Sequence, residues 1–138
     1  MSMLHDNIIK SYCVDFEAET IMLKTIFHNY TDKIIENTDV IFTGYLTHNF
    51  GHECKGSVIF DINEYPLNLF LEQEAELFED NKNYGWPILY KTENELIEFI
   101  QANKYKVFEV ASSYGLFGWV FAKQMDIVID RQPFNPTE

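Results

Sequence analysis

The chain has 138 residues and carries 22 acidic side chains against 10 basic ones, a formal net charge of −12 at pH 7. A surface this acidic repels nucleic acid and attracts cations, so we expect a basic protein as partner and exclude nucleic acid. The hydrophobic fraction of 46%, with 12 Phe, 8 Tyr and 2 Trp, excludes wholesale disorder. The length predicts a single domain spanning 1–138, with an ordered core of about 7–130.

Cysteine content and hydropathy indicate the compartment. The two cysteines, Cys13 and Cys54, are too few for a disulfide scaffold. No stretch of the sequence approaches the roughly 20 apolar residues of a membrane span, and the first ten residues lack the pattern of a secretory signal. The sequence therefore predicts a cytoplasmic protein without membrane contact, and no motif in it calls for a cofactor.

The first third of the chain shows the two-residue alternation of strands. Residues 8–16 and 20–28 alternate and are separated by the short polar break Glu17-Ala18-Glu19, which predicts an antiparallel hairpin. A third strand is expected over 34–46, bent near Gly44, and a fourth over 57–62. These four strands together predict a meander.

The middle of the chain changes to helical spacing. A first helix is expected from Pro66, which suits a first helical turn, to a stop within 81–85. Its apolar stripe consists of Leu67, Phe70, Leu71, Ala75 and Phe78. Residues 88–90 could form a very short strand. Thr92 and Glu95 have the spacing of a capping box and predict the start of a second helix.

The last third returns to alternation. We expect a strand over 105–111, a glycine-containing turn over 112–118, a strand over 119–129 and a flexible tail over 131–138. The predicted class is α+β: an antiparallel sheet with a meander of about four strands, then two helices, then a C-terminal hairpin. The helices are expected to pack on one face of the sheet.

One segment concentrates reactive side chains. His48, His52, Glu53 and Cys54 are residue types that bind zinc or form a Cys–His nucleophile pair. A histidine pair four residues apart serves zinc when both lie on one helical face, but Gly51 and the flanking strand pattern place this segment in a turn. We therefore predict no metal site and no catalytic residues, and His48 and His52 stand as the candidates should a metal be bound.

Two further features have both a functional and a structural interpretation. The aromatic segment 112–119 could line a ligand pocket or form an exposed hot spot, or it could cap the end of the core. The acidic face of the first helix could dock a basic protein, or it could simply be solvated. The candidate partner-binding residues are Glu72, Glu76, Glu79, Asp80, Tyr114, Phe117 and Trp119.

Four segments carry a resemblance: 38–42, 56–62, 84–87 and 112–120 are similar to those of a group of small uncharacterised bacterial proteins. The resemblance runs from about residue 7 to 130 and implies no activity for any residue. In overall form the chain is also similar to immunity proteins of bacterial toxin systems, which are small, acidic, single-domain and α+β.

The preferred functional hypothesis is an acidic, non-enzymatic, cytoplasmic protein-binding domain, immunity-like, that masks a cationic protein partner. The alternative is a small enzyme or ligand-binding domain with a site near His48, His52 and Ser113–Trp119. A third hypothesis is self-association, in which exposed strand edges pair between copies to form a homodimer.

Overall fold

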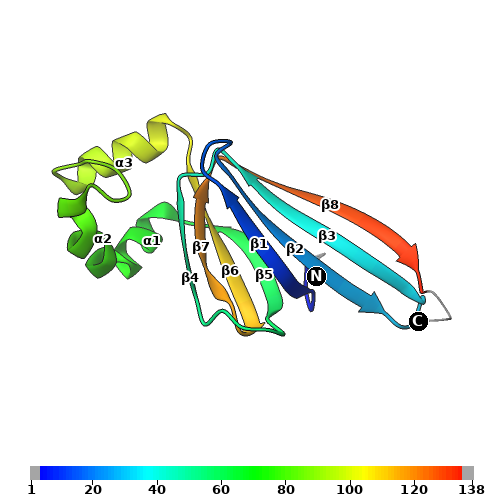
Figure 1. Ribbon diagram of the computed structural model, residues 1–138. Coiled ribbons are helices and arrows are strands. Elements are labelled where there is room, and N and C mark those ends of the chain that lie inside the picture. The colour runs from blue at the N-terminus through cyan, green and yellow to red at the C-terminus, as the bar shows by residue number, and fades with distance from the viewer. Residues whose placement is uncertain (1–3, 135–138) are drawn as a thin grey trace.

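The computed structural model describes residues 4–134 and is dominated by an eight-stranded antiparallel sheet (Figure 1). The strands are β1 (Ile8–Asp15), β2 (Thr20–Asn29), β3 (Ile34–Thr43), β4 (Thr47–Gly51), β5 (Val58–Tyr65), β6 (Lys106–Tyr114), β7 (Phe117–Ala122) and β8 (Gln124–Pro133). The helical elements are α1 (Leu67–Gln73), α2 (Ala75–Asn81), α3 (Glu93–Ala102) and the single 3-10 turn η1 (Lys82–Tyr84).

The strand order is β4-β7-β6-β5-β1-β2-β3-β8, which corrects the expected four-strand meander with helices and a hairpin. Two runs of three strands are neighbours in chain order, β1-β2-β3 and β5-β6-β7, and the expected fourth strand of the meander, β5, pairs with β1 instead of β3. The expected strand 34–46 ends at Thr43, because Gly44 adopts a positive φ of +65° that turns the chain away. The following strand, β4, then pairs with β7 at the opposite edge of the sheet. The predicted α+β class is therefore wrong: the protein is sheet-dominated, with three short α-helices in the described residues.

The sheet divides into two halves that the chain links at one corner. We call β4-β7-β6-β5 the helix-covered half and β1-β2-β3-β8 the open half. At the corner, the Lys123 backbone N–H donates to the Thr43 carbonyl (2.9 Å), and the Leu46 N–H donates to the Phe121 carbonyl (2.9 Å). Figure 1 shows the helices beside the helix-covered half, while β2, β3 and β8 extend away from them.

A first hydrophobic core lies between the two halves. It draws on the inner faces of both, and the rings of Phe42 on β3 and Phe108 on β6 lie 5.3 Å apart. The side chains from β2 and β3 are fully buried: Ile21, Leu23, Val40 and Phe42. Burial alternates from residue to residue around these positions, because one face of each strand packs on the core and the other does not.

A second core lies between the helix-covered half and the helices. It consists of Phe70, Leu71, Phe78, Leu96, Ile100, Val107, Trp119 and Phe121. Strand β7 contributes to both cores, with Trp119 and Phe121 toward the helices and Val120 and Ala122 toward the inner core. A strand buried on both faces becomes a nearly continuous apolar run, which explains the sequence of β7.

The helical region differs from the expected pattern at Glu74 and at residues 88–90, and it matches that pattern at the Thr92 cap. The expected first helix is broken at Glu74 (φ −103°, ψ 19°) into α1 and α2, and residues 88–90 form no strand. Thr92 caps α3 as predicted, its hydroxyl accepting the Glu95 N–H at 3.3 Å. The Glu95 carboxylate reaches back to the Lys91 N–H (2.9 Å), one residue before the cap.

The C-terminal strands are longer than expected and the turn between them is shorter. The turn consists of Gly115, with a φ of +80°, and Leu116, so the expected turn over 112–118 is wrong. The expected strand 119–129 is interrupted at Lys123. Strand β8 includes 131–133 of the expected tail, and residues 135–138 lie outside the described residues.

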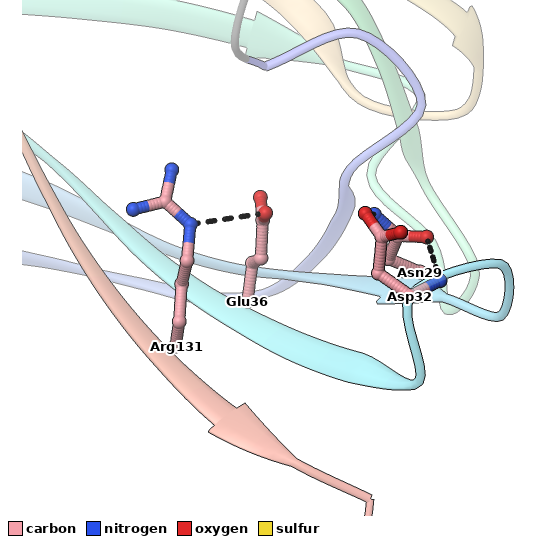
Figure 2. A network of polar contacts seen from close by, with 4 residues as sticks. All are labelled: Asn29, Asp32, Glu36 and Arg131. Atoms are coloured by element: carbon pink, nitrogen blue, oxygen red, sulfur yellow. Dashed lines mark hydrogen bonds and ion pairs between the residues drawn. The ribbon is translucent and has the colours of Figure 1, made fainter.

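The far end of the open half is held by short-range polar contacts (Figure 2). In the turn between β2 and β3, the Asn29 side-chain amide donates to the Asp32 carboxylate (3.1 Å), and the Asp32 N–H donates to the Asn29 side-chain oxygen (3.0 Å). The guanidinium of Arg131 on β8 pairs with Glu36 on β3, with Nε to Oε1 at 3.2 Å. The single arginine of the chain is thus bound to an internal acidic partner.

Candidate functional site

A cavity of about 430 Å³ lies between helix α1 and the outer face of the helix-covered half, and we call it the helix–sheet pocket. Four aromatic side chains line it: Tyr65, Phe70, Phe117 and Trp119. Its volume falls in the range of ligand-binding pockets, about 300–1,000 Å³. Phe117 is 46% exposed, whereas Trp119 is 6% exposed, so the aromatic lining runs from the surface into the second core.

Strand register places the polar groups of the pocket beside its aromatic rings. On the outer face, Trp119 of β7 stands directly between Glu109 of β6 and Asn49 of β4. Helix α1 packs over this row through Phe70, whose ring lies 5.0 Å from that of Trp119 in an edge-on arrangement. Gly51 faces Phe117 across the same pair of strands, and its missing side chain leaves the space beside that ring open.

The pocket has an acidic character. Two carboxylates, those of Glu74 and Glu109, line it, and no Lys, Arg or His does. Within residues 4–134 neither carboxylate accepts a hydrogen bond or joins an ion pair. Glu74 reaches the pocket because it is the residue at which α1 ends and α2 begins. Two negative charges with no bound counter-charge, set among aromatic rings, favour an organic cation as the occupant.

The expected partner-binding residues lie in different places: the acidic ones are on the helix surface, and two of the three aromatic ones line the pocket. Glu72, Glu76, Glu79 and Asp80 are exposed on α1 and α2. Phe117 and Trp119 line the helix–sheet pocket, whereas Tyr114 is 61% exposed at the end of β6 and lies outside it. The acidic helices and the aromatic segment are about 40 residues apart in sequence, and they meet where Glu74 follows α1.

Sequence reasoning missed three of the polar groups in this pocket. Glu109 is the only charged residue within the apolar run of β6 from Val107 to Ala111, a signal that could have found it. The position of Glu74 at a helix break could not be predicted, because no Gly or Pro marks the break between α1 and α2. Tyr65 belongs to β5, which continues three residues beyond the expected strand end at residue 62.

The histidine segment does not form one site. His48 faces the inner core, where its Nδ1 lies 2.6 Å from the Tyr45 hydroxyl. His52 instead packs its ring edge-on against Phe117, with centroids 4.9 Å apart. In the described part of the chain, no three His, Cys, Asp or Glu side chains are arranged to hold a metal ion. Neither histidine lines the helix–sheet pocket.

A polar cluster surrounds His48 and joins the two halves of the sheet. The Tyr12 hydroxyl of β1 donates to the Glu53 carboxylate at 2.5 Å. This hydrogen bond, together with burial and the negative charge of Glu53, raises the pKa of Tyr12 to about 12. Burial lowers the pKa of His48, and the charge of Glu53 opposes that shift. Burial also raises the pKa of Tyr45. The cluster thus favours neutral tyrosines and a neutral imidazole.

No protein-family model, curated protein or solved structure matches the chain. The two resemblances noted from the sequence therefore stay expectations. Among the described helices, none combines the length and the apolar character needed to cross a bilayer.

Proposed function

We propose that this chain is a non-enzymatic protein-binding domain whose partner is a basic protein, which it masks in the manner of an immunity protein. The observation that carries the proposal is an acidic surface with little internal neutralisation. The net charge is −12, yet the described residues contain two ion pairs, His5–Asp6 and Glu36–Arg131. Most carboxylate charges are therefore not neutralised by a basic side chain of the protein, and their electrostatic field can attract a basic partner.

The helices α1 and α2 are the proposed docking surface. They carry exposed Glu72, Glu76, Glu79 and Asp80, and they border the helix–sheet pocket through Gln73 and Glu74. Charges at the rim of an interface accelerate encounter, and buried aromatic anchors slow dissociation. The exposed acids would supply the first effect, and the aromatic lining of the pocket the second.

A small-molecule binding domain is the second candidate. The 430 Å³ pocket favours it, because the segment Ser113–Trp119 named in that hypothesis contributes three of the lining residues, Phe117, Gly118 and Trp119. The histidines named with it lie elsewhere, which leaves the pocket without an imidazole to act as acid or base.

The proposal is tested by affinity capture from the native cell at low ionic strength, followed by association kinetics with the purified captured protein. We expect a basic partner whose association rate falls by roughly tenfold or more between low and high salt. A neutral or acidic partner, or an association rate independent of salt, would contradict the proposal.

A pair of charge variants locates the surface. Glu76→Lys with Asp80→Lys reverses two exposed charges on α2, and Asp126→Lys with Asp130→Lys makes the same change in charge on β8 of the open half. We expect the α2 variant to slow association with the captured protein more than the β8 variant does. Equal slowing would mean that total charge, and not the helical surface, directs the encounter.

A further inference from the structure

We propose that the helix–sheet pocket binds the guanidinium group of an arginine from the basic partner. This inference rests on the proposed function and specifies its anchor. It joins three features of one cavity: unpaired carboxylates, aromatic walls and the absence of a basic side chain among the residues that line it.

The carboxylates select for positive charge. Glu74 and Glu109 reach the pocket from different elements, the junction of two helices and the middle of β6. Neither has a hydrogen-bonding or ionic partner within residues 4–134. A cation entering the pocket would gain charge-assisted hydrogen bonds without first displacing a resident lysine or arginine.

The aromatic lining selects for a flat cation on an apolar stem. Phe117 at the exposed side and Trp119 deeper in the pocket offer ring faces or edges to the methylene groups of a long side chain and to its charged head. Arginine fits this lining better than lysine, because its planar guanidinium stacks on rings and hydrogen-bonds a carboxylate through two N–H groups at once.

A second, smaller cavity of the chain already combines a cation, an aromatic ring and two carboxylates. The Lys82 ammonium lies 5.7 Å from the ring centroid of Tyr90. Burial, and after it the negative charges of Glu79 and Glu93, raise the pKa of that tyrosine. These two carboxylates line a cavity of about 130 Å³ together with Lys82 and Tyr90. In that cavity the cation comes from the chain itself. In the larger helix–sheet pocket the carboxylates and rings are present and the cation is missing from the lining.

Two tripeptide probes test the inference: acetyl-Gly-Arg-Gly-amide and its citrulline counterpart, which has nearly the same shape but no charge. Binding is followed by NMR through the indole N–H of Trp119, because Trp119 lines the pocket. We expect the arginine probe to shift this signal to saturation and the citrulline probe to leave it unchanged. Equal shifts with both probes would overturn the proposal.

Matched charge variants separate the pocket from the general acidity of the chain. Glu74→Gln with Glu109→Gln removes the two pocket carboxylates, and Asp126→Asn with Asp130→Asn removes two exposed ones from β8 of the open half. We expect the pocket variant to bind the arginine probe at least roughly tenfold more weakly, and the control to stay within about twofold of the original chain. Equal weakening in both variants would overturn the proposal. An unchanged pattern of amide signals verifies that each variant is folded.

The pocket and the proposed function can fail separately. Capture of a basic protein that the pocket variant binds as tightly as the original chain does would overturn the arginine site and leave the function standing. Saturable arginine binding by a chain whose captured partner is acidic would overturn the function and leave the site.

Discussion

Strand β7 of the helix-covered half is buried on both faces, whereas β2 and β3 of the open half are fully buried on their inner face alone. On the covered half, Trp119 and Phe121 of β7 are enclosed by the helices. On the open half, the corresponding outer positions alternate between half-buried aliphatic residues and acids, such as Ile41 beside Asp126. Glu109 is a half-buried carboxylate directly beside Trp119 on the outer face of the helix-covered half.

This contrast separates structural acids from candidate functional ones. Asp126 and Asp130 on the edge strand β8 accept hydrogen bonds from Gln124 and Gln132, and charges on an edge discourage pairing with other chains. Glu74 and Glu109 have no such partner and lie in a cavity. The proposed recognition surface therefore lies on the helix-covered half, and self-association through an edge stays a prediction.

The largest expected effect contrasts the outer faces of the two halves. Phe121→Ala should lower the free energy of unfolding by about 3–5 kcal/mol, because this ring is fully buried under the helices. Val128→Ala should change it by less than about 0.5 kcal/mol, because that side chain is 54% exposed. Chemical denaturation measures both. Similar losses would mean that something covers the open half in solution.

A smaller effect concerns the inner core that both halves share. The Thr38 hydroxyl is buried on β3 without a hydrogen-bonding partner, while the neighbouring Thr25 donates to the Thr38 carbonyl at 2.8 Å. Thr38→Val removes the unpaired group and keeps the branched shape, so stability should rise by about 1 kcal/mol. A loss of stability on denaturation would show that the hydroxyl has a partner, such as a buried water.

Alkaline titration probes the contact between the halves. Tyr12 stays neutral in the folded chain up to a pKa of about 12, whereas an unfolded tyrosine ionises near 10.0. Unfolding between these pH values releases a proton, so stability from this group is complete below pH 10 and falls as pH rises toward 12. Glu53→Gln should lower the pKa of Tyr12 and flatten that part of the stability profile. An unchanged profile would mean that Glu53 does not hold Tyr12 in solution.

The same substitution has a second, smaller effect on the acid side. Glu53 raises the pKa of His48 against the larger lowering by burial. Glu53→Gln should therefore lower the pKa of His48 further, as measured by NMR of the imidazole protons. Because the folded pKa lies below the usual 6.5, stability is lost as pH falls below that value, and the variant should lose more. A rise in the pKa of His48 would contradict this arrangement.

Local signals in the sequence predicted local structure and little else. The hairpin of β1 and β2 was found because alternation on both sides of a polar break marks it, and Thr92 because a capping box is a short-range pattern. The pairing of β4 with β7 was not found, because it depends on where a kink at Gly44 sends the chain. For the helix–sheet pocket, the sequence indicated the aromatic residues Phe117 and Trp119. It did not indicate the carboxylates of Glu74 and Glu109, which line the same pocket.

Recognition on the helix-covered half is tested most directly by mapping the amide signals that acetyl-Gly-Arg-Gly-amide perturbs across the whole chain. If arginine binds in the helix–sheet pocket, the largest changes fall on the helix-covered half, around Glu74, Glu109 and Trp119. Changes centred on the outer face of the open half, around Ile41 and Val128, would contradict it.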